Sequence, residues 1–174
     1  SRAPRRYTTH VVRRESCLVR RVVVTGMGIV SPLGNDMANV FDRLLAAESA
    51  VQRLPESFNR RLKSRVVAPS LLDLDARIPP ARARMLDRVS QFALAACASA
   101  IADARLVLAD EDASQVGVSI GTGMGGAQST DDGYQSVYEQ QSERVVPFSV
   151  ILAMNNAPAS WIAIEHDLQG PNLT

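Results

Sequence analysis

The pattern most suggestive of chemistry is a glycine-rich loop at residues 121–126, which reads Gly-Thr-Gly-Met-Gly-Gly. It follows an apolar run at 116–120 that is short and rich in Val and Ile, and is therefore typical of a buried strand. Because glycine has no Cβ and tolerates positive φ, such a loop lets the backbone come close to a ligand. The loop also fits G-x-G-x-x-G, the pattern that cradles a pyrophosphate in dinucleotide-binding proteins.

Several features weaken the dinucleotide interpretation. The adjacent Gly125 and Gly126 make the loop looser than the fingerprint requires. The acidic residue that would bind the ribose would have to be Glu139 or Glu143, which lie in a polar segment and not at the end of a strand. A second near-match at 26–31 lacks the third glycine, and the chain has no Gly-Lys-Ser/Thr sequence that would form a P-loop. The loop by itself therefore predicts a binding site without naming its ligand.

Candidate nucleophiles and bases are few. Cys17 and Cys97 have no metal-ligand spacing. Cys97 falls on the apolar face of an Ala-rich helical pattern, which favours a small core residue over a reactive thiol. His10 lies in a basic N-terminal segment, and His166 lies near the end of a helical pattern, where a surface capping role is favoured over a catalytic base. The residues themselves indicate no nucleophile paired with its base.

Composition and charge exclude several classes of protein. Of the 174 residues, 46% are hydrophobic and 21% are charged, which is typical of an α/β or α+β globular domain and excludes wholesale disorder. The net charge of +1 provides no global field for nucleic acid. No apolar run approaches ~18 residues, so we expect no transmembrane helix and no membrane partner.

Residues 1–21 form a basic arm, which we expect to be mobile because it lacks hydrophobic periodicity. Its arginines and its shortage of acidic residues resemble an organellar transit peptide. The two isolated cysteines, on the other hand, favour a reducing compartment. We therefore expect a cytoplasmic protein, with an organellar location as the alternative.

The first elements of the chain are predicted to be a strand and a helix. A β-branched run at 22–25 predicts a strand that ends in a glycine turn at 26–28. Asn35 or Asp36 can cap a following helix. That helix would carry one apolar face, formed by Met37, Val40, Phe41, Leu44 and Leu45.

The middle of the chain is predicted to be irregular and then helical. Residues 49–79 are interrupted by prolines and predict at most short strands, such as one at 65–68. A 3.6-residue period that runs from Met85 to Ala104 predicts a long helix whose small residues suit close packing.

The last third predicts a central strand followed by helical segments. The strand at 116–121 precedes the glycine loop, and residues 127–143 show a weak helical stripe. Residues 145–152 predict an apolar loop around a proline. Asn155 or Asn156 can cap a last helix, which Gly170 and Pro171 would end before another strand starts at 172.

Three motifs, in this order along the chain, resemble the β-ketoacyl-[acyl-carrier-protein] synthases, especially the elongating type II condensing enzymes. Residues 22–34 resemble their opening signature, residues 120–126 their central glycine loop, and residues 170–174 the segment that leads into their active-site cysteine. The resemblance implies an α/β, thiolase-like αβαβα sandwich. It would be incomplete, with residues 22–174 as the N-terminal domain, truncated before the active-site cysteine.

The resemblance also implies an activity and partners. The family is one of acyltransferases of fatty-acid or polyketide synthesis, which condense malonyl-carrier protein with an acyl thioester by decarboxylation, using a cysteine and two histidines. It implies acyl carrier protein and acyl and malonyl thioesters as partners, and a homodimer. No cysteine or histidine of this chain matches a catalytic position. We therefore assign no catalytic residue, no cofactor and no metal, and expect this chain alone to be inactive.

An acyl pocket can be transferred from the resemblance. Met124 occupies the loop position that lies at the acyl-chain tunnel in the family, and Phe148 and Val150 match the region that reaches into the pocket of the partner subunit. A flexible thioether suits an apolar tunnel, although the alternative that Met124 only fills core stays open.

Two other functions also stay open. One is a non-catalytic, chain-length-factor-like subunit of a condensing heterodimer, and the other is a nicotinamide-nucleotide-binding domain.

Because a second half of the fold would cover the strand at 116–121, we expect a chain limited to residues 1–174 to aggregate.

Overall fold

The computed structural model describes residues 21–54, 63–70, 72–73, 78–145 and 147–174. The helices are α1 (Met37–Leu45), α2 (Pro80–Ala83), α3 (Arg88–Ala104), α4 (Ala127–Tyr134), α5 (Ser149–Ala153) and α6 (Ala157–Glu165). The strands are β1 (Gln52–Arg53), β2 (Val66–Val67), β3 (Val118–Ser119) and β4 (Asn172–Leu173). Short 3₁₀ turns lie at Leu108–Asp110 (η1) and Ala113–Gln115 (η2), and a π-helical turn at Gln135–Glu139 (η3) continues α4.

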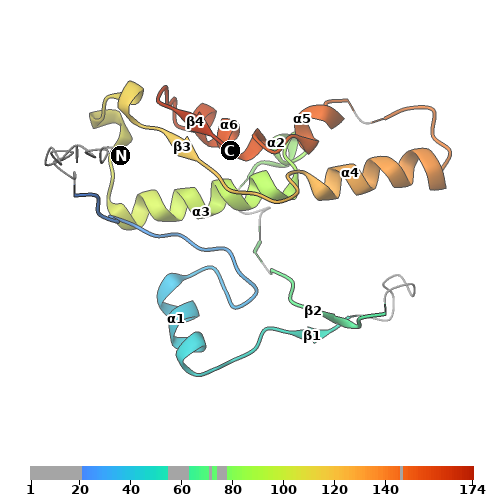
Figure 1. Ribbon diagram of the computed structural model, residues 1–174, viewed down its shortest axis with the longest axis horizontal. Helices are drawn as coiled ribbons and strands as arrows, with labels where there is room; N and C mark the ends of the chain where they lie inside the picture. Colours follow the sequence, from blue (N-terminus) through green and yellow to red (C-terminus); the bar gives the residue numbers. More distant parts are fainter. Residues whose placement is uncertain (1–20, 55–62, 71, 74–77, 146) are drawn as a thin grey trace, which may run out of the picture.

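These elements form two parts. Figure 1 shows the body, residues 78–174, arranged along α3, with α6, β3 and β4 on one side and α4 near the end of α3 at which that helix begins. The N-terminal lobe, residues 31–70 where described, contains α1 and the β1–β2 hairpin and lies on the other side of α3. In the described ranges, no helix is both long enough and apolar enough to cross a membrane.

The hydrophobic core of the body lies between α3 and α6. α3 begins at Arg88 because the side chain of Asp87 accepts a hydrogen bond from the Val89 amide. Leu94 of α3 and Ile162 of α6 belong to the buried cluster. Val118 of β3 and Ile120, which follows β3, pack against this cluster. The other buried members of the cluster are Leu72, Ile78, Leu86 and Ala95.

The segment at 21–30 crosses α3 in close contact and forms no strand. A Cβ added at Gly26 or Gly28 would lie within 3.0 Å of the α3 backbone at Ala96, Ala100 or Ala104. The amide of Met27 donates to Asp103 Oδ2 at 2.8 Å. The predicted strand at 22–25 is therefore wrong, because in the described part of the chain this run has no neighbouring strand to pair with. The glycines are explained by packing against a small-residue face.

The central strand predicted at 116–121 is confirmed in part: β3 covers Val118–Ser119 and pairs in parallel with β4. The Val118 amide donates to the Pro171 carbonyl at 2.8 Å, and the Ile120 amide donates to the Leu173 carbonyl at 3.0 Å. Gly170 lies so close to Val116 that a Cβ there would clash with the Val116 carbonyl. The strand start predicted at 172 is also confirmed. Two of the three motifs thus lie side by side.

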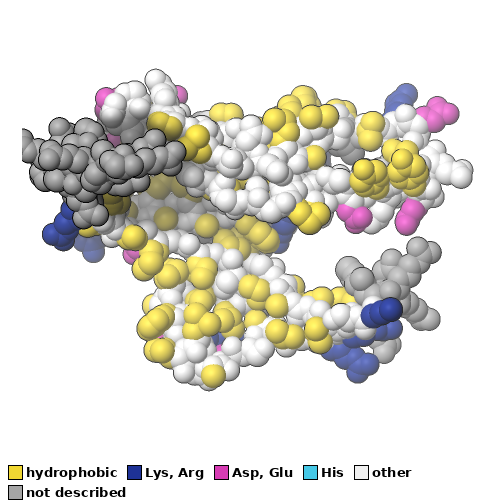
Figure 2. Space-filling model, viewed as in Figure 1, with side chains coloured by type: hydrophobic (Ala, Val, Ile, Leu, Met, Phe, Trp, Pro, Cys, Tyr) yellow, Lys and Arg dark blue, Asp and Glu magenta, His cyan; other side chains and the backbone are white. Residues whose placement is uncertain are grey.

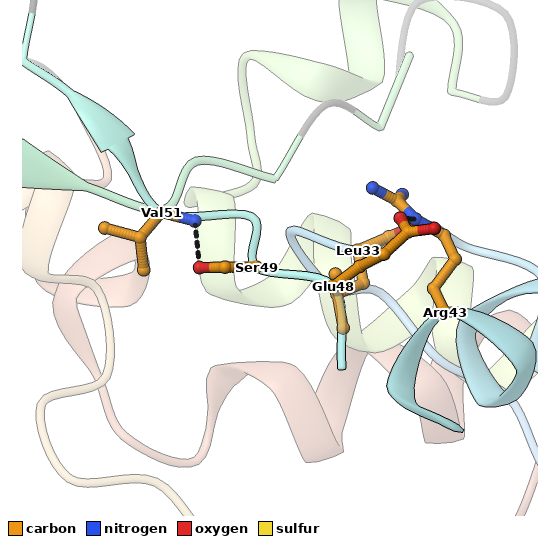
Figure 3. Close-up of polar contacts among 5 residues, drawn as sticks. All are labelled: Leu33, Arg43, Glu48, Ser49 and Val51. Atoms are coloured by element: carbon orange, nitrogen blue, oxygen red, sulfur yellow. Dashed lines mark hydrogen bonds and ion pairs between the residues drawn. The ribbon is translucent and has the colours of Figure 1, made fainter. Parts of the chain in front are cut away.

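The N-terminal lobe is held by few contacts. Asp36 caps α1 as predicted, accepting from the Asn39 amide at 2.8 Å. Of the apolar face of α1, only Val40 is buried, and Figure 2 shows hydrophobic side chains gathered on the surface of this lobe. The Arg43 guanidinium pairs with Glu48 at 2.6 Å and also donates to the Leu33 carbonyl, which ties α1 to the preceding turn (Figure 3).

The β1–β2 hairpin is antiparallel, with Gln52 opposite Val67. The short strand predicted at 65–68 is confirmed by β2, whereas β1 was not predicted. The amide of Val51, just before β1, donates to the Ser49 hydroxyl at 3.2 Å (Figure 3).

Three other predicted boundaries are wrong. Met85 precedes the long helix, because Asp87 sets its start. The predicted loop at 145–152 contains the start of α5 at Ser149. α6 ends at Glu165, before Gly170, and its candidate cap Asn156 makes no side-chain capping bond. The basic arm, apart from Arg21, and its residues His10 and Cys17 lie outside the described residues.

Candidate functional site

The glycine loop connects β3 to α4, and its two ends have different surroundings. Gly121 and Gly123 have open space where a Cβ would stand. Gly125 has a φ of +54°, and its amide donates to the Thr122 hydroxyl at 3.2 Å. A Cβ on Gly126 would overlap the Leu152 carbonyl of α5. The second half of the loop is therefore fixed against α5, whereas the first half is free to face a ligand.

The start of α4 does not offer an anion site. A dinucleotide fingerprint needs free amides at the helix N-terminus, where the pyrophosphate binds. Here the Ser129 amide donates at 2.8 Å to Asp87 Oδ2, and Asp87 is a buried carboxylate that would repel a phosphate. The Gly126 amide also donates to the Ala153 carbonyl, at 3.3 Å. The geometry argues against the nicotinamide-nucleotide interpretation.

The three residues of the expected acyl pocket lie on the surface. Met124 is 76% exposed in the loop, Phe148 is 59% exposed just before α5, and Val150 is 72% exposed in the first turn of α5. Phe148 has a φ of 67°, which is unusual for a side chain of its size. The described residues do not enclose these three side chains in one pocket.

Val150 lines an apolar groove of about 330 Å³ between α4, η3 and α5. Its wall includes Tyr134 and Tyr138, whose rings stack with centroids 5.8 Å apart. Both tyrosines are exposed. Both lie in the weak helical stripe predicted at 127–143, but they were not predicted as candidate site residues. The available signal was two aromatic residues four positions apart on a polar helix.

Cys97 lies on α3, and His166 is the residue that directly follows α6. Cys97 is half-buried on α3, and burial raises the pKa of its thiol, which disfavours the reactive thiolate. It lines an apolar trough of about 440 Å³ between α3 and β3. His166 ends α6, where its amide donates to the Ile162 carbonyl, and it lies beside the ion pair of Arg82 and Glu165.

A protein-family model identifies the family of this chain. The model of the family described as "Beta-ketoacyl synthase, N-terminal domain" matches residues 19–174. The chain belongs to the β-ketoacyl synthase family. Its first motif at 22–34, the glycine loop and the 170–174 segment all lie within the matched region.

Curated relatives include 3-oxoacyl-[acyl-carrier-protein] synthase 2 of Vibrio cholerae, 34% identical over 158 residues. The enzyme of the same name from Vibrio harveyi is 35% identical over 156 residues. Each alignment covers 88% of this chain but 37% of the relative. The chain thus spans little more than a third of the length of these β-ketoacyl synthases.

Solved structures share the fold. A β-ketoacyl synthase from Burkholderia phymatum aligns with a TM-score of 0.72 and 29% identity, over 87% of this chain and 38% of that one. The ishigamide ketosynthase/chain length factor aligns with a TM-score of 0.73 at 22% identity, over 88% of this chain and 38% of that one. The second likeness shows the fold alone. The expected class, an incomplete thiolase-like α/β fold, is confirmed.

Proposed function

We propose that the complete protein is a β-ketoacyl-[acyl-carrier-protein] synthase. The observation that carries this proposal is the family match over residues 19–174, which includes all three motifs. The pairing of β3 with β4 supports it, since it brings the strand before the glycine loop beside the 170–174 segment. In the proposed reaction a cysteine thiolate attacks the acyl thioester and takes the acyl group, and the carrier-protein thiol leaves. Loss of CO₂ from the malonyl thioester then leaves a carbanion. The carbanion then forms a carbon–carbon bond to the acyl carbonyl as the thiolate leaves.

The nucleophile of this reaction would come from outside the described residues. Cys97 is a poor candidate, because its half-buried thiol has a raised pKa. His166, which directly follows α6, matches no catalytic position in the family resemblance. From the resemblance we expect the cysteine a few residues after a Gly-Pro-Asn-Leu-Thr segment such as 170–174.

The acyl chain would bind at Met124, Phe148 and Val150. Their exposure supports this assignment, because apolar side chains of this size are stabilised when a ligand or a second subunit covers them. The exposed groove beside Val150, with Tyr134 and Tyr138, extends the same surface. We propose a homodimer in which this surface approaches the second subunit. Acyl carrier protein and acyl and malonyl thioesters would be the partners, with no cofactor, in the cytoplasm.

The proposal is tested with the complete protein, malonyl-carrier protein and an acyl-carrier protein. Mass spectrometry should detect a β-ketoacyl product two carbons longer than the acyl substrate. A complete protein that forms no product and accepts no acyl group would refute the enzymatic proposal.

A chain-length-factor-like subunit is the second candidate. The surroundings of Cys97 and His166 do not distinguish it from the enzyme, because both proposals place the nucleophile outside the described residues. It predicts product only after a separate ketosynthase is added. An acyl-enzyme adduct on the purified protein by itself would exclude it.

The acyl site is tested by Met124→Trp in the complete protein. A larger side chain in an acyl tunnel should shorten the accepted acyl chain, because cavity volume limits chain length. Met85→Trp, at another exposed methionine, is the matched control. Chain-length preferences that are equal in the two variants would remove Met124 from the acyl site.

A further inference from the structure

Asp87 is a buried carboxylate at the junction of α3 and α4. It is 4% exposed, although carboxylates are rarely buried unless they are paired. Its Oδ1 accepts from the Val89 amide at 3.0 Å, and its Oδ2 accepts from the Ser129 amide at 2.8 Å. One side chain therefore bonds to the first turns of two helices, α3 and α4.

α4 depends on this distant residue. Its own N-cap position is Gly126, which has no side chain to satisfy the free amides of the first turn. The Asp87 carboxylate supplies both the missing acceptor and a negative charge at the positive end of the helix. Asp36 and Asp112 are the comparison in the same chain, since the bonds of each stay within its own segment: Asp36 accepts from the Asn39 amide, and Asp112 accepts from the amide and the hydroxyl of Ser114.

The amide that Asp87 holds lies three residues after the glycine loop. On its other side, the loop is held by Gly125 and Gly126 against α5, with the Gly126 amide donating to Ala153. The open part of the loop, which carries Met124, therefore leads directly into a region fixed at two points. Movement of the first turn of α4 would move Met124 as well.

A second α3 side chain bonds to the segment that precedes α3. Gln91, one turn after Asp87, donates through Nε2 to the carbonyls of Ala83 and Leu86, at 3.2 and 3.0 Å. Asp87 thus accepts from one amide at the start of α3 and from one amide at the start of α4. Gln91 donates to the carbonyl of Ala83, which ends α2, and to that of Leu86 after it. A cavity of about 330 Å³ between these helices is lined by both side chains.

We propose that Asp87 is a positioning residue of the acyl site, which fixes the Met124 loop by capping α3 and α4 together. This inference rests on the proposed condensing function. Asp87 itself touches no substrate in this assignment and acts through the first turn of α4.

The test compares Asp87→Asn with Asp36→Asn in the complete protein. Asparagine still caps its own helix, but in Asp87→Asn the new side chain would turn either an amide group or a single weaker oxygen toward Ser129. Hydrogen exchange of residues 121–134 should accelerate by about tenfold in Asp87→Asn, because a charge-assisted bond is lost. Exchange over 121–134 should stay unchanged in Asp36→Asn. If Asp87→Asn fails to fold, Asp87→Ser replaces it, because serine caps α3 but is too short to bridge.

Activity supplies the readout that a purely structural role would not change. For Asp87→Asn we expect kcat/KM with long acyl thioesters to fall by about tenfold, and more than with short ones, because a displaced binding wall misplaces the substrate. Asp36→Asn should stay within about twofold at every chain length. An unchanged chain-length profile in Asp87→Asn, or wild-type exchange over 121–134, would overturn the inference.

Failure of the proposed function gives a different result. In that case the wild-type protein forms no β-ketoacyl product. The comparison of hydrogen exchange between Asp87→Asn and Asp36→Asn still tests whether Asp87 caps both α3 and α4. If the Ser129 amide of the wild-type protein exchanges as fast as an unprotected amide, the inference fails whatever the activity.

Discussion

α1 and α6 are both nine residues long, but different forces hold them. α1 has a side-chain cap from Asp36 and a clear apolar face, yet it buries only Val40. α6 has no side-chain cap and is apolar on all sides, and it buries Ala157, Pro158, Ala159 and Ile162. A helix that is apolar all round is typical of a core position. Local signals thus form the helix of the N-terminal lobe, whereas burial forms the helix of the body.

The sharpest test removes a large side chain from each helix. Ile162→Ala should lower the free energy of unfolding of the complete protein by about 2–5 kcal/mol, since Ile162 is 3% exposed and its loss leaves a cavity. Leu45→Ala, on the exposed face of α1, should cost less than about 0.5 kcal/mol. Urea denaturation measures both. A large cost at Leu45 would show that α1 is covered in the complete protein and would break the comparison.

The contact between the 21–30 segment and α3 is tested by adding one methyl group. Gly28→Ala should cost about 1–3 kcal/mol, because its Cβ would overlap the backbone of α3 at Ala96 and Ala100. Gly133→Ala, inside α4 with open space around it, should stabilise by about 1 kcal/mol through helix propensity. Thermal melts of the two variants should therefore shift in opposite directions. Equal shifts would mean that the segment does not lie on α3.

Truncation of the residue at the N-cap position should lower stability in α1 but not in α6. Asp36→Ala should destabilise by about 1 kcal/mol, because the Asn39 amide loses its acceptor. Asn156→Ala should change stability little, since this side chain makes no capping bond. Circular dichroism during denaturation gives both values. A larger loss of stability in Asn156→Ala than in Asp36→Ala would contradict the conclusion that local capping supports α1 and burial supports α6.

The smallest predicted effect is the pH dependence of fold stability that arises from Glu165. The hydrogen bond from Arg82 lowers the pKa of Glu165, and the charges of Arg82 and His166 lower it further, whereas desolvation raises it. Because the folded pKa lies below the unfolded one, this ion pair stabilises the fold at neutral pH. That contribution is lost as the pH falls through the folded pKa.

Glu165→Gln should therefore lower Tm slightly at neutral pH and not at all in strong acid. The effect should stay well below about 1 kcal/mol, since both side chains of the pair are about a third exposed. Glu139→Gln, at an exposed position of η3, is the control. A difference in Tm between the wild type and Glu165→Gln that grows as the pH falls would contradict the predicted direction of this pH dependence.

Part of the candidate site could be predicted from the sequence, and part could not. The glycine loop after β3 follows from a short apolar run that ends in glycines. Its tolerance of positive φ was also predictable, whereas the structure shows that Gly125 adopts it. The assignment of Met124, Phe148 and Val150 to an acyl pocket came from a family resemblance and stays a prediction. Tyr134 and Tyr138 were missed, because a stripe on a helix does not show which groove it lines.

By itself, the sequence determined the elements with strong local signals: α1 with its Asp36 cap, the long α3, the strand at β3 and the family of the chain. Only the tertiary structure decided where those elements meet. Residues 22–25 pair with no strand among the residues that the structure describes, and Gly26 and Gly28, which follow them, pack against α3. The bond from Asp87 to Ser129 joins residues 42 positions apart. Capping and periodicity act over a few residues, whereas pairing and close packing depend on segments that lie far apart in the chain.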